Sequence, residues 1–589
     1  MRENTPAGFR KDITAISLRG TCWTGVLANA NKGGITEMTS KAKLALAMGV
    51  GVAFAFGATT AAQATKVKRG GVLNLVVGSK IPSFDGHKES TFGMIHPIRP
   101  FYSLLLRVDP NNPQSPTAFQ CDVCEGEMPT PTNDGKRYTF KIKKNVTFHD
   151  GQKMTAHDVV ATHQKIIFPG KGVASVRKGF FGMVEKISAP DDYTVVFDLK
   201  YASPGFLPAL ATPFNFIYSK ADMEKHGMAW HQKNINGTGA FEFVQHQPGA
   251  FVEGKARAGY HHMGADGKAL PYLDGFKAIS APKMAVRVQA IRGDRAAIEF
   301  RGFPPKTRDD LVKALGDKIT VQEGDWNCMM GASTNVNPTA NGGPAWHAAA
   351  KDPRVKQALS LAMDRWGGSK YLSKIALVRT VGGVAFPKHP LAATKEELMK
   401  MPSYNPDNKV RRDMAKKLLA EAGQSKLNFK LHNRAVDQPY KVVGTWMIDQ
   451  WKKIGLDIEQ QVLPTGPCFD GLRKKKTYQV GIDFNCQSVV NPVVDAAKWI
   501  SKDKTGNNYA SFIDRQLDEW YDQMNRESDP AKQAEIMRKF ERRALWEQSH
   551  FMVNYWWFKI NPHRSYVKGW KQAPSHYLNQ HLDQVYLDK

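Results

Sequence analysis

Catalytic signatures are missing from this sequence of 589 residues. It contains neither G-x-S-x-G, which presents the nucleophile in many hydrolases, nor H-E-x-x-H, which holds zinc in metalloproteases. Its 17 histidines are scattered, and His149, His157 and His163 are not spaced to share one helical face. We therefore expect no enzymatic activity, no cofactor and no metal site.

Long apolar runs are missing as well. No stretch after residue 64 reaches the roughly 18 apolar residues of a membrane-spanning helix. The run Leu44–Phe56 is shorter, follows the basic segment Met38–Lys43 and precedes an A-x-A site that ends at Ala64. This pattern predicts a leader with a signal peptide in residues 1–64, cleaved after Ala64, and hence a periplasmic protein. Met38 is the expected start, and an unusually long leader is the alternative.

Acidic residues are under-represented. The chain has 55 of them against 82 Lys and Arg, which gives a formal net charge of +27. The basic residues are spread along the chain, whereas a nucleic-acid binder concentrates them in one patch or arm. The charge fits a protein that attracts anionic solutes or faces acidic surfaces, and we expect no nucleic-acid partner.

Cysteine is scarce, with six residues, of which Cys22 belongs to the predicted leader. The other five are an odd number, so at least one is a free thiol or pairs with another molecule. Cys121 and Cys124 have C-x-x-C spacing, which favours a local disulfide in an oxidising compartment. Zinc is less well supported, because no second C-x-x-C exists and the H-x₅-H pair of His157 and His163 begins about thirty residues after Cys124. The pairing of the remaining cysteines stays open: Cys328, Cys468 and Cys486.

The most regular pattern in the chain lies between residues 133 and 167. Asn133–Gly135 is a turn signal, and the alternation of apolar and polar residues over 138–142 predicts a half-buried strand. Residues 146–148 are expected to form a return strand, completing a hairpin. Thr155 then caps a helix, with Asp158 in the capping-box position.

This order of residues, D-G-x-x-Y-T-F-x-I with V-x-F-H-D-G and T-A-x-D-V after it, resembles family 5 extracellular solute-binding proteins. These are the peptide- and nickel-binding receptors of ABC importers. Two further segments resemble the same family: D-P-R-V-K-Q-A-L at 352–359, and the predicted helix of 405–423, which ends at Gly423. The matches extend from about residue 70 to about residue 570. We expect these motif residues to be scaffold.

The resemblance implies an α/β fold with two lobes, a hinge and a central ligand cleft. It is the type II periplasmic-binding-protein fold, of the large cluster with an extra subdomain. Lobe 1 is expected at 65–310 and 550–589, with an inserted subdomain at about 110–225, and lobe 2 at 311–549. The implied function is capture of a small, peptide-like or other solute by a monomer. The receptor is then expected to deliver the solute to the ABC permease subunits in the inner membrane.

The segment Gly481–Pro492 resembles the family's ligand loop, G-W-x-x-D-x-x-x-P, when the two are aligned on Pro492. In peptide receptors the Asp of this loop pairs with the ligand's α-ammonium group. Here Ser488 stands at that position, while Asn485 and Phe484 replace the Trp and the Gly. Because serine carries no charge, we expect a neutral or anionic solute rather than a peptide held by its amino terminus.

Other candidates come from the loops that the resemblance places at the cleft. Arg473 falls where some peptide receptors hold a ligand carboxylate, and Arg434 is a second candidate; for both, a solvated surface charge is the alternative. Trp326 is either an aromatic wall of the cleft or ordinary core. The complete set of expected ligand-binding residues is Ser83, Phe84, Trp326, Asn327, Arg434, Arg473, Asn485, Cys486 and Ser488.

A basic exported protein that binds polyanions, such as cell-wall polymers or nucleic acid, is the alternative function. A secreted hydrolase is a more distant one and requires a nucleophile–base pair in the cleft.

Salt dependence separates the receptor from the polyanion binder. Raising the salt from about 50 to about 200 mM weakens a binder with six or more anionic contacts roughly a thousandfold. A solute enclosed in a cleft is screened far less, so we expect a modest change. Fluorescence titration at both salt concentrations measures this, and a loss of a thousandfold would favour the polyanion binder.

Overall fold

The computed structural model describes residues 67–589. The predicted signal peptide, its cleavage site and Cys22 lie outside the described residues. Within 67–589 no helix has the length and apolar character needed to cross a membrane.

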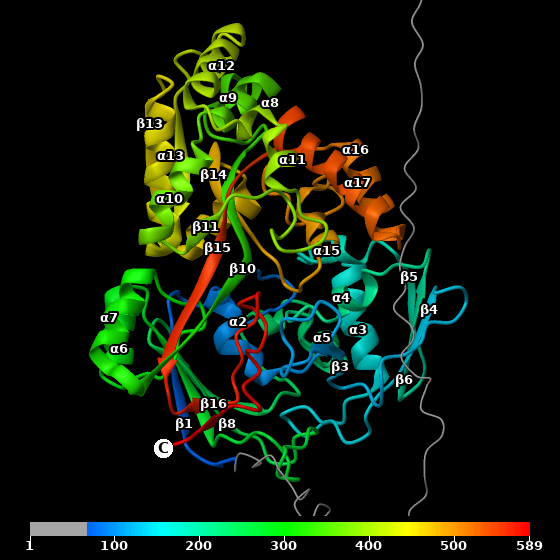
Figure 1. Cartoon of the computed structure of the whole chain (residues 1–589). Coiled ribbons are helices and arrows are strands. Elements are labelled where there is room, and N and C mark those ends of the chain that lie inside the picture. Colours follow the sequence, from blue (N-terminus) through cyan, green and yellow to red (C-terminus); the bar gives the residue numbers. More distant parts are fainter. Residues whose placement is uncertain (1–66) are drawn as a thin grey trace, which may run out of the picture. The chain divides into compact units, whose positions relative to one another are not determined.

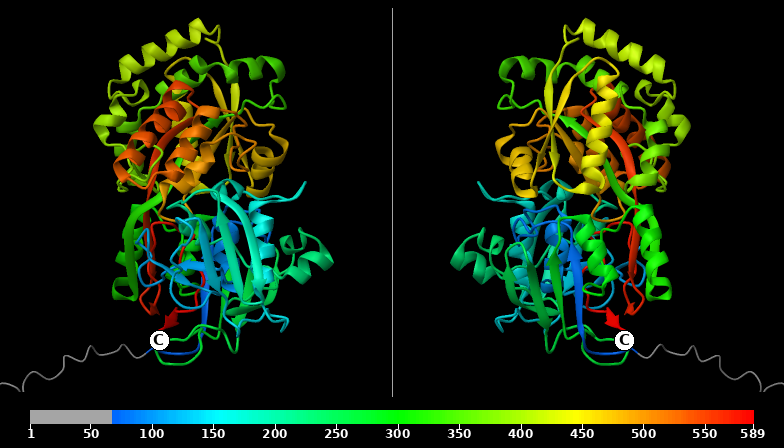
Figure 2. Two further views of the ribbon diagram at one scale, coloured as in Figure 1. Left: turned by 90° about the vertical axis from the view of Figure 1, so that its right-hand side faces the viewer. Right: turned by 90° about the vertical axis from the view of Figure 1, so that its left-hand side faces the viewer.

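Two long antiparallel strands run through both halves of the described chain: β10 (Ile319–Thr334) and β15 (Phe551–Arg564). In Figure 1 the lower parts of these strands are surrounded by residues 67–318 and 565–589, which we call lobe 1. Their upper parts are surrounded by residues 335–550, which we call lobe 2. Figure 2 shows the same division from two sides. Because β10 and β15 belong to both lobes, the boundaries predicted at 310/311 and 549/550 stay a proposal.

The main sheet of lobe 1 has the order β1-β9-β8-β7. Its strands are β1 (Val72–Val77), β9 (Gly275–Ser280), β8 (Phe251–Ala256) and β7 (Phe241–Gln247). β1 pairs with β9 in parallel, and the other pairs are antiparallel. The predicted strand after the Gly70–Gly71 pair is therefore β1. Four of its apolar side chains are buried, Leu73, Leu75, Val76 and Val77, and Ser79 in the loop that follows bonds to Thr465 of lobe 2.

A three-stranded sheet, β4-β6-β5, lies in the region predicted as an inserted subdomain. β4 (Arg137–Lys141) pairs with β6 (Thr194–Leu199), which forms a hairpin with β5 (Val184–Asp191). The predicted hairpin of 138–142 with 146–148 is wrong. Residues 146–148 do not pair with 138–142: Thr147 forms an isolated antiparallel bridge with Lys153, and Val146 and Phe148 are buried core side chains.

The predicted capped helix is present as α3 (Ala156–Ile167). The carboxylate of Asp158 accepts a hydrogen bond from the Thr155 N–H at 2.8 Å, and Val159, Ile166 and Ile167 are buried. The other helices of lobe 1 are α2 (Phe92–Ile98), α4 (Phe206–Leu210), α5 (Lys220–His226), α6 (Met284–Arg292) and α7 (Pro305–Leu315). Its short strands are β2 (Leu106–Val108), β3 (Phe119–Cys121), β16 (Val567–Lys568) and β17 (Tyr586–Leu587).

Lobe 2 is built on a six-stranded sheet with the order β11-β15-β10-β14-β12-β13. Besides β10 and β15 its strands are β11 (Val378–Thr380), β14 (Val480–Cys486), β12 (Phe429–Arg434) and β13 (Ile458–Leu463). β12 runs parallel to both β13 and β14. Helices connect these parallel strands, which is the arrangement of an α/β lobe.

Both helices predicted from the family motifs are present. Asp352 caps α9 (Pro353–Leu361) by accepting the Arg354 N–H at 2.9 Å. α12 (Asn408–Glu421) ends just before Gly423, whose φ is +67°. The remaining helices are α8 (Gly343–Lys351), α10 (Arg365–Ile375), α11 (Lys395–Met399), α13 (Val442–Lys452), α14 (Thr465–Phe469), α15 (Pro492–Asp495), α16 (Arg515–Arg526) and α17 (Pro530–Arg542).

The pairing of β10 with β15 depends on Gly331. A Cβ atom at this position would lie 1.8 Å from the carbonyl oxygen of Met552 on β15. Every residue of β10 from Trp326 to Thr334 is buried, so neither strand has room to move aside.

We predict that Gly331→Ala lowers the free energy of unfolding by about 3 kcal/mol or more, because the methyl group forces two buried strands apart. Gly182→Ala is the matched control, since its added Cβ meets no atom within 4 Å. Urea unfolding of both variants measures the effect, and equal stabilities would contradict the assignment.

Candidate functional site

A small cavity lies between the two lobes. Lobe 1 contributes Ser90, Arg177, Phe180, Phe214 and Tyr577, and lobe 2 contributes Phe484, Asn485, Cys486, Ser488, Asp495, Lys498, Asn507 and Tyr509. The space open to the centres of water-sized spheres is about 30 Å³. That is room for roughly two water molecules, so the lobes are closed on each other.

The lobe 2 wall of the cavity is formed by the end of β14 and the start of α15. β14 carries Phe484, Asn485 and Cys486 to the cavity. Asn491 caps α15 by accepting the N–H groups of Val493 and Val494, both at 3.1 Å. This short helix places Asp495 in the wall.

The Asp495 carboxyl group is buried, and within residues 67–589 its Oδ2 atom has no hydrogen-bond partner. Burial raises the pKa of Asp495 well above its usual value, although the Ser488 backbone N–H and Arg177 act in the opposite direction. The neutral carboxyl is therefore favoured. A neutral carboxyl can donate a hydrogen bond into the cavity.

Arg177 is the cation on the lobe 1 side. It donates to the carbonyl oxygens of Gly86 at 2.9 Å and Glu89 at 2.8 Å, and its guanidinium lies 4.0 Å from the centre of the Phe214 ring. Burial lowers the pKa of Arg177 to about 9. In the described part of the chain no carboxylate forms an ion pair with it, so its charge remains available to a ligand.

A second cation of the cavity, Lys498, is neutralised within lobe 2. Its Nζ atom lies 3.0 Å from Asp483 Oδ1 and 4.1 Å from the centre of the Tyr509 ring. Burial raises the pKa of Asp483, and Lys498 opposes that shift. The wall therefore presents one neutral acid, one internal ion pair and the unpaired charge of Arg177.

The interpretation of Arg434 and Arg473 as solvated surface charges is wrong. Arg473 forms an ion pair with Glu89 of lobe 1 at 3.3 Å, and Arg434 donates to Thr91 at 3.0 Å. Ser79 and Thr465 add a hydrogen bond of 3.1 Å between the lobes. Arg434 ends β12, and the carboxyl ends of these parallel strands face lobe 1, which is why its side chain is buried.

Four other predicted residues do not line the cavity. Ser83 donates to Glu89 at 2.8 Å, and the Phe84 ring packs against that of His246. Trp326 is fully buried and donates from Nε1 to His576 Nδ1 at 3.0 Å, which makes it core and not a wall. Asn327 donates to the carbonyl oxygen of Val489 at 3.4 Å.

Of the nine predicted residues, Asn485, Cys486 and Ser488 line the cavity. Sequence reasoning missed Arg177 and Asp495. Asp495 lies only three residues after Pro492, on which the family loop was aligned, so an acidic residue just beyond the loop was the signal available. Arg177 lies in no recognisable motif.

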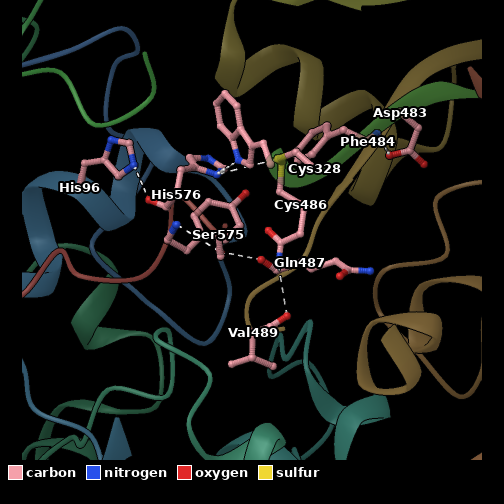
Figure 3. The surroundings of a disulfide bond; sticks show 12 residues. His96, Cys328, Asp483, Phe484, Cys486, Gln487, Val489, Ser575 and His576 are labelled. Atoms are coloured by element: carbon pink, nitrogen blue, oxygen red, sulfur yellow. Dashed lines mark hydrogen bonds between the residues drawn. A yellow bond between two sulfur atoms is a disulfide. The ribbon is translucent and has the colours of Figure 1, made fainter. Parts of the chain in front are cut away.

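Two disulfides are present in the described chain. One joins Cys121 to Cys124, the pair expected from the spacing. The other joins Cys328 of β10 to Cys486 of β14 beside the cavity, with His576 next to it (Figure 3). Cys468 is buried and, within 67–589, is the free thiol.

Two groups of side chains have the composition of metal sites. Cys328 and Cys486 with His576 form one, but their sulfur atoms are joined to each other. Asp122, His261 and His262 form the other. Arg99 lies 3.3 Å from the Asp122 carboxylate, so a cation in that site would face a buried positive charge.

A larger hollow of about 730 Å³ lies beside α10 and β11. Its lining includes Trp366, Lys370 and Arg379, and all of it belongs to lobe 2. Because no lobe 1 residue contributes, it lacks the two-sided enclosure of the interlobe cavity.

Lys559 on β15 is a buried amine. Within the described residues its Nζ atom has no hydrogen-bond partner, and burial lowers the pKa of Lys559 to about 7. The unfolded chain holds this proton up to about pH 10.4. Between these values unfolding takes up a proton, so stability rises with pH.

We predict that the free energy of unfolding of the wild type, relative to Lys559→Met, rises between pH 7 and pH 10 by up to about 1.4 kcal/mol per pH unit. Urea unfolding at three pH values measures it. Lys568→Met, at an exposed lysine, controls for loss of a positive charge. Parallel curves for the wild type and Lys559→Met would contradict the prediction.

Residues 125–507 match the model of bacterial extracellular solute-binding proteins, family 5. The oligopeptide-binding protein AppA of Bacillus subtilis is 26% identical over 356 residues, covering 56% of this chain and 59% of AppA. The glutathione-binding protein GsiB of Escherichia coli K12 is 22% identical over 511 residues, covering 84% of this chain and 90% of GsiB. The chain thus spans little more than half the length of AppA.

Solved structures share the fold. Helicobacter pylori DppA in complex with the peptide STSA has a TM-score of 0.73 at 19% identity and covers 89% of this chain and 99% of its own. AgaA from A. tumefacien R10 in complex with agropinic acid has a TM-score of 0.75 at 19% identity and covers 88% and 99%. The predicted two-lobed α/β binding-protein fold is confirmed. The family match covers well over half of the sequence, and the chain belongs to the family 5 bacterial extracellular solute-binding proteins.

Proposed function

We propose that this protein is a periplasmic receptor that encloses a small solute with an anionic group between its lobes and delivers it to the permease of an ABC importer. Family membership supports the receptor and its location outside the cytoplasm. The single observation that supports an anionic solute is the unpaired charge of Arg177 in the interlobe cavity.

Burying a charge without a partner costs several kcal/mol, and an anion in the cavity offsets that cost. The carbonyl groups that hold Arg177 fix its position but do not neutralise it. A protonated Asp495 across the cavity adds a donor for the same anion. A ligand ammonium group would instead meet a positive charge and, at Ser488, an uncharged hydroxyl.

The ligands named for similar proteins include peptides and an acidic small molecule. They are an oligopeptide for AppA, glutathione for GsiB and agropinic acid for AgaA. The cavity of this chain supports the acidic members of that set over a peptide held by its amino terminus.

Entry of the solute requires the lobes to separate. A pocket for a small molecule measures about 300–1,000 Å³, far more than the space open in the closed arrangement. Separation about β10 and β15 breaks the Arg473–Glu89 ion pair and the Arg434–Thr91 hydrogen bond, which lie between the lobes. These two contacts are therefore the closing contacts of the receptor.

A thermal-shift comparison of matched ligands tests the proposal. N-acetylated dipeptides keep the carboxylate and lack the ammonium, whereas dipeptide amides keep the ammonium and lack the carboxylate. We expect the acids to raise the melting temperature and the amides to leave it unchanged, because ligand binding to the folded state adds stability. Strong stabilisation by the amides would overturn the proposal.

Variants assign the roles of the two cavity residues. Arg177→Met should weaken binding of the acids roughly 10- to 100-fold, the usual effect of losing a charged hydrogen bond. Asp495→Asn should change it less than about threefold, because an amide also donates. A large loss in Asp495→Asn with Arg177→Met unaffected would indicate an ammonium site. Native mass spectrometry of protein purified without refolding would then weigh any solute retained.

A further inference from the structure

Arg301 is an arginine buried among aromatic rings. It lies in lobe 1 before α7 and is 1% exposed. Its guanidinium carbon is 4.6 Å from the ring centre of Phe92, 5.2 Å from that of Trp557 and 5.6 Å from that of Tyr440. The rings stabilise the cation from their faces but offer no acceptor in its plane.

The hydrogen-bonding atoms of this guanidinium are unsatisfied. Within residues 67–589, its Nε and Nη2 atoms are buried and have no hydrogen-bond partner. Glu299 is the carboxylate near it, and Glu299 pairs with Arg287 at 3.4 Å. Burial lowers the pKa of Arg301 to about 10, and the charge of Arg434 acts in the same direction.

Another buried arginine shows that this chain can satisfy every nitrogen of such a group. Arg365 is also 1% exposed and lies over an aromatic ring, that of Tyr404 at 4.6 Å. It donates to the carbonyl oxygens of Val553, Ser360 and Ser403 and to the hydroxyl of Ser360, all within 3.0 Å. Arg301 has the same burial and the same kind of ring but none of these acceptors.

Arg434 approaches the same rings from lobe 2. Its guanidinium carbon is 5.2 Å from the ring centre of Phe92 and 5.6 Å from that of Tyr440. Two of its nitrogens bond to Thr465 and Thr91, and within the described chain Nη1 has no partner. Two cations from opposite lobes therefore share two rings, and both keep free donors.

We infer that Arg301 and Arg434 form a second anion subsite, which takes an oxyanion group of the solute, a carboxylate or a phosphate. The inference rests on the proposed function and extends it: the solute carries two separated anionic groups, one at Arg177 and one at the Arg301–Arg434 pair. An oxyanion accepts hydrogen bonds from both guanidinium groups at once.

A continuous row of cations and rings connects the two subsites. Arg434 lies 4.9 Å from the Phe469 ring centre, and Arg473 lies 4.1 Å from it on the way to Tyr509. Tyr509 belongs to the cavity wall. All four side chains of this row belong to lobe 2, so separation of the lobes opens one face along which an elongated solute can reach both subsites.

The test uses linear α,ω-dicarboxylates from succinate to suberate, monocarboxylates of equal length, and inorganic phosphate. Melting temperature and calorimetric affinity are measured for the wild type, Arg301→Met, Arg301→Lys and Arg365→Met. We expect at least one dicarboxylate to bind the wild type more tightly than its monocarboxylate. Arg301→Met should remove that advantage, a loss of roughly 10- to 100-fold, and Arg301→Lys should keep part of it.

The ligand-free proteins supply an independent readout. Arg301→Met should melt at the wild-type temperature or above it, because it removes an unsatisfied buried charge. Arg365→Met, the matched control, should melt lower and retain the affinity of the wild type for dicarboxylates. If Arg365→Met does not fold, the two Arg301 variants still decide the matter.

The outcomes separate this inference from the proposal on which it rests. If acids bind through Arg177 and Arg301→Met binds dicarboxylates as tightly as the wild type does, the second subsite is overturned and the receptor for an anion remains. If no acid and no phosphate binds the wild type, the proposed anionic solute falls as well. Binding of phosphate that depends on Arg301, without binding of dicarboxylates, would support the subsite and identify a phosphate group as its ligand.

Discussion

The pairing of β10 with β15 is the constraint that positions everything else in this protein. The two strands run through both lobes, so residues far apart in the sequence are placed relative to one buried ladder. β14 pairs with β10 on its other side and carries Asn485 and Cys486 to the cavity. The Cys328–Cys486 disulfide fixes that pair of strands at the point where the cavity begins.

Buried positive charge is satisfied in two ways within the lobes. Carboxylates neutralise it in the ion pairs of Arg107 with Asp583 at 2.7 Å and of Arg99 with Asp122 at 3.3 Å. Carbonyl oxygens accept the hydrogen bonds of Arg365. Between the lobes, the described contacts leave donors of Arg301 and Arg434 without acceptors. The contrast matters because buried charges without partners are rarely tolerated for structural reasons alone.

The sequence was sufficient for the family, the two-lobed fold and most elements, because these depend on local patterns. The capped helix α3, the strand β1 and the helix that ends before Gly423 follow from capping, alternation and glycine chemistry. Pairing between distant strands could not be predicted from the sequence. β4 pairs with β6, more than fifty residues away, and not with residues 146–148. The site was predicted only in part for the same reason. Ser488 and Asn485 belong to a recognisable loop, whereas Arg177 and Arg301 become site residues only when the lobes close over them.

The interlobe charges also explain how closure can depend on the solute. With no anion in place, Arg301 of lobe 1 and Arg434 of lobe 2 repel each other across Phe92 and Tyr440, which favours separation of the lobes. The Arg473–Glu89 ion pair favours closure but satisfies only one of the cations at the contact. In the proposed receptor, an anion that neutralises Arg301 and Arg434 binds the closed form better than the open form. This difference in affinity shifts the population toward the closed form. For the proposed anionic solute, the basic character of the whole chain, a formal +27, acts earlier by raising the local concentration of that solute at the open cleft.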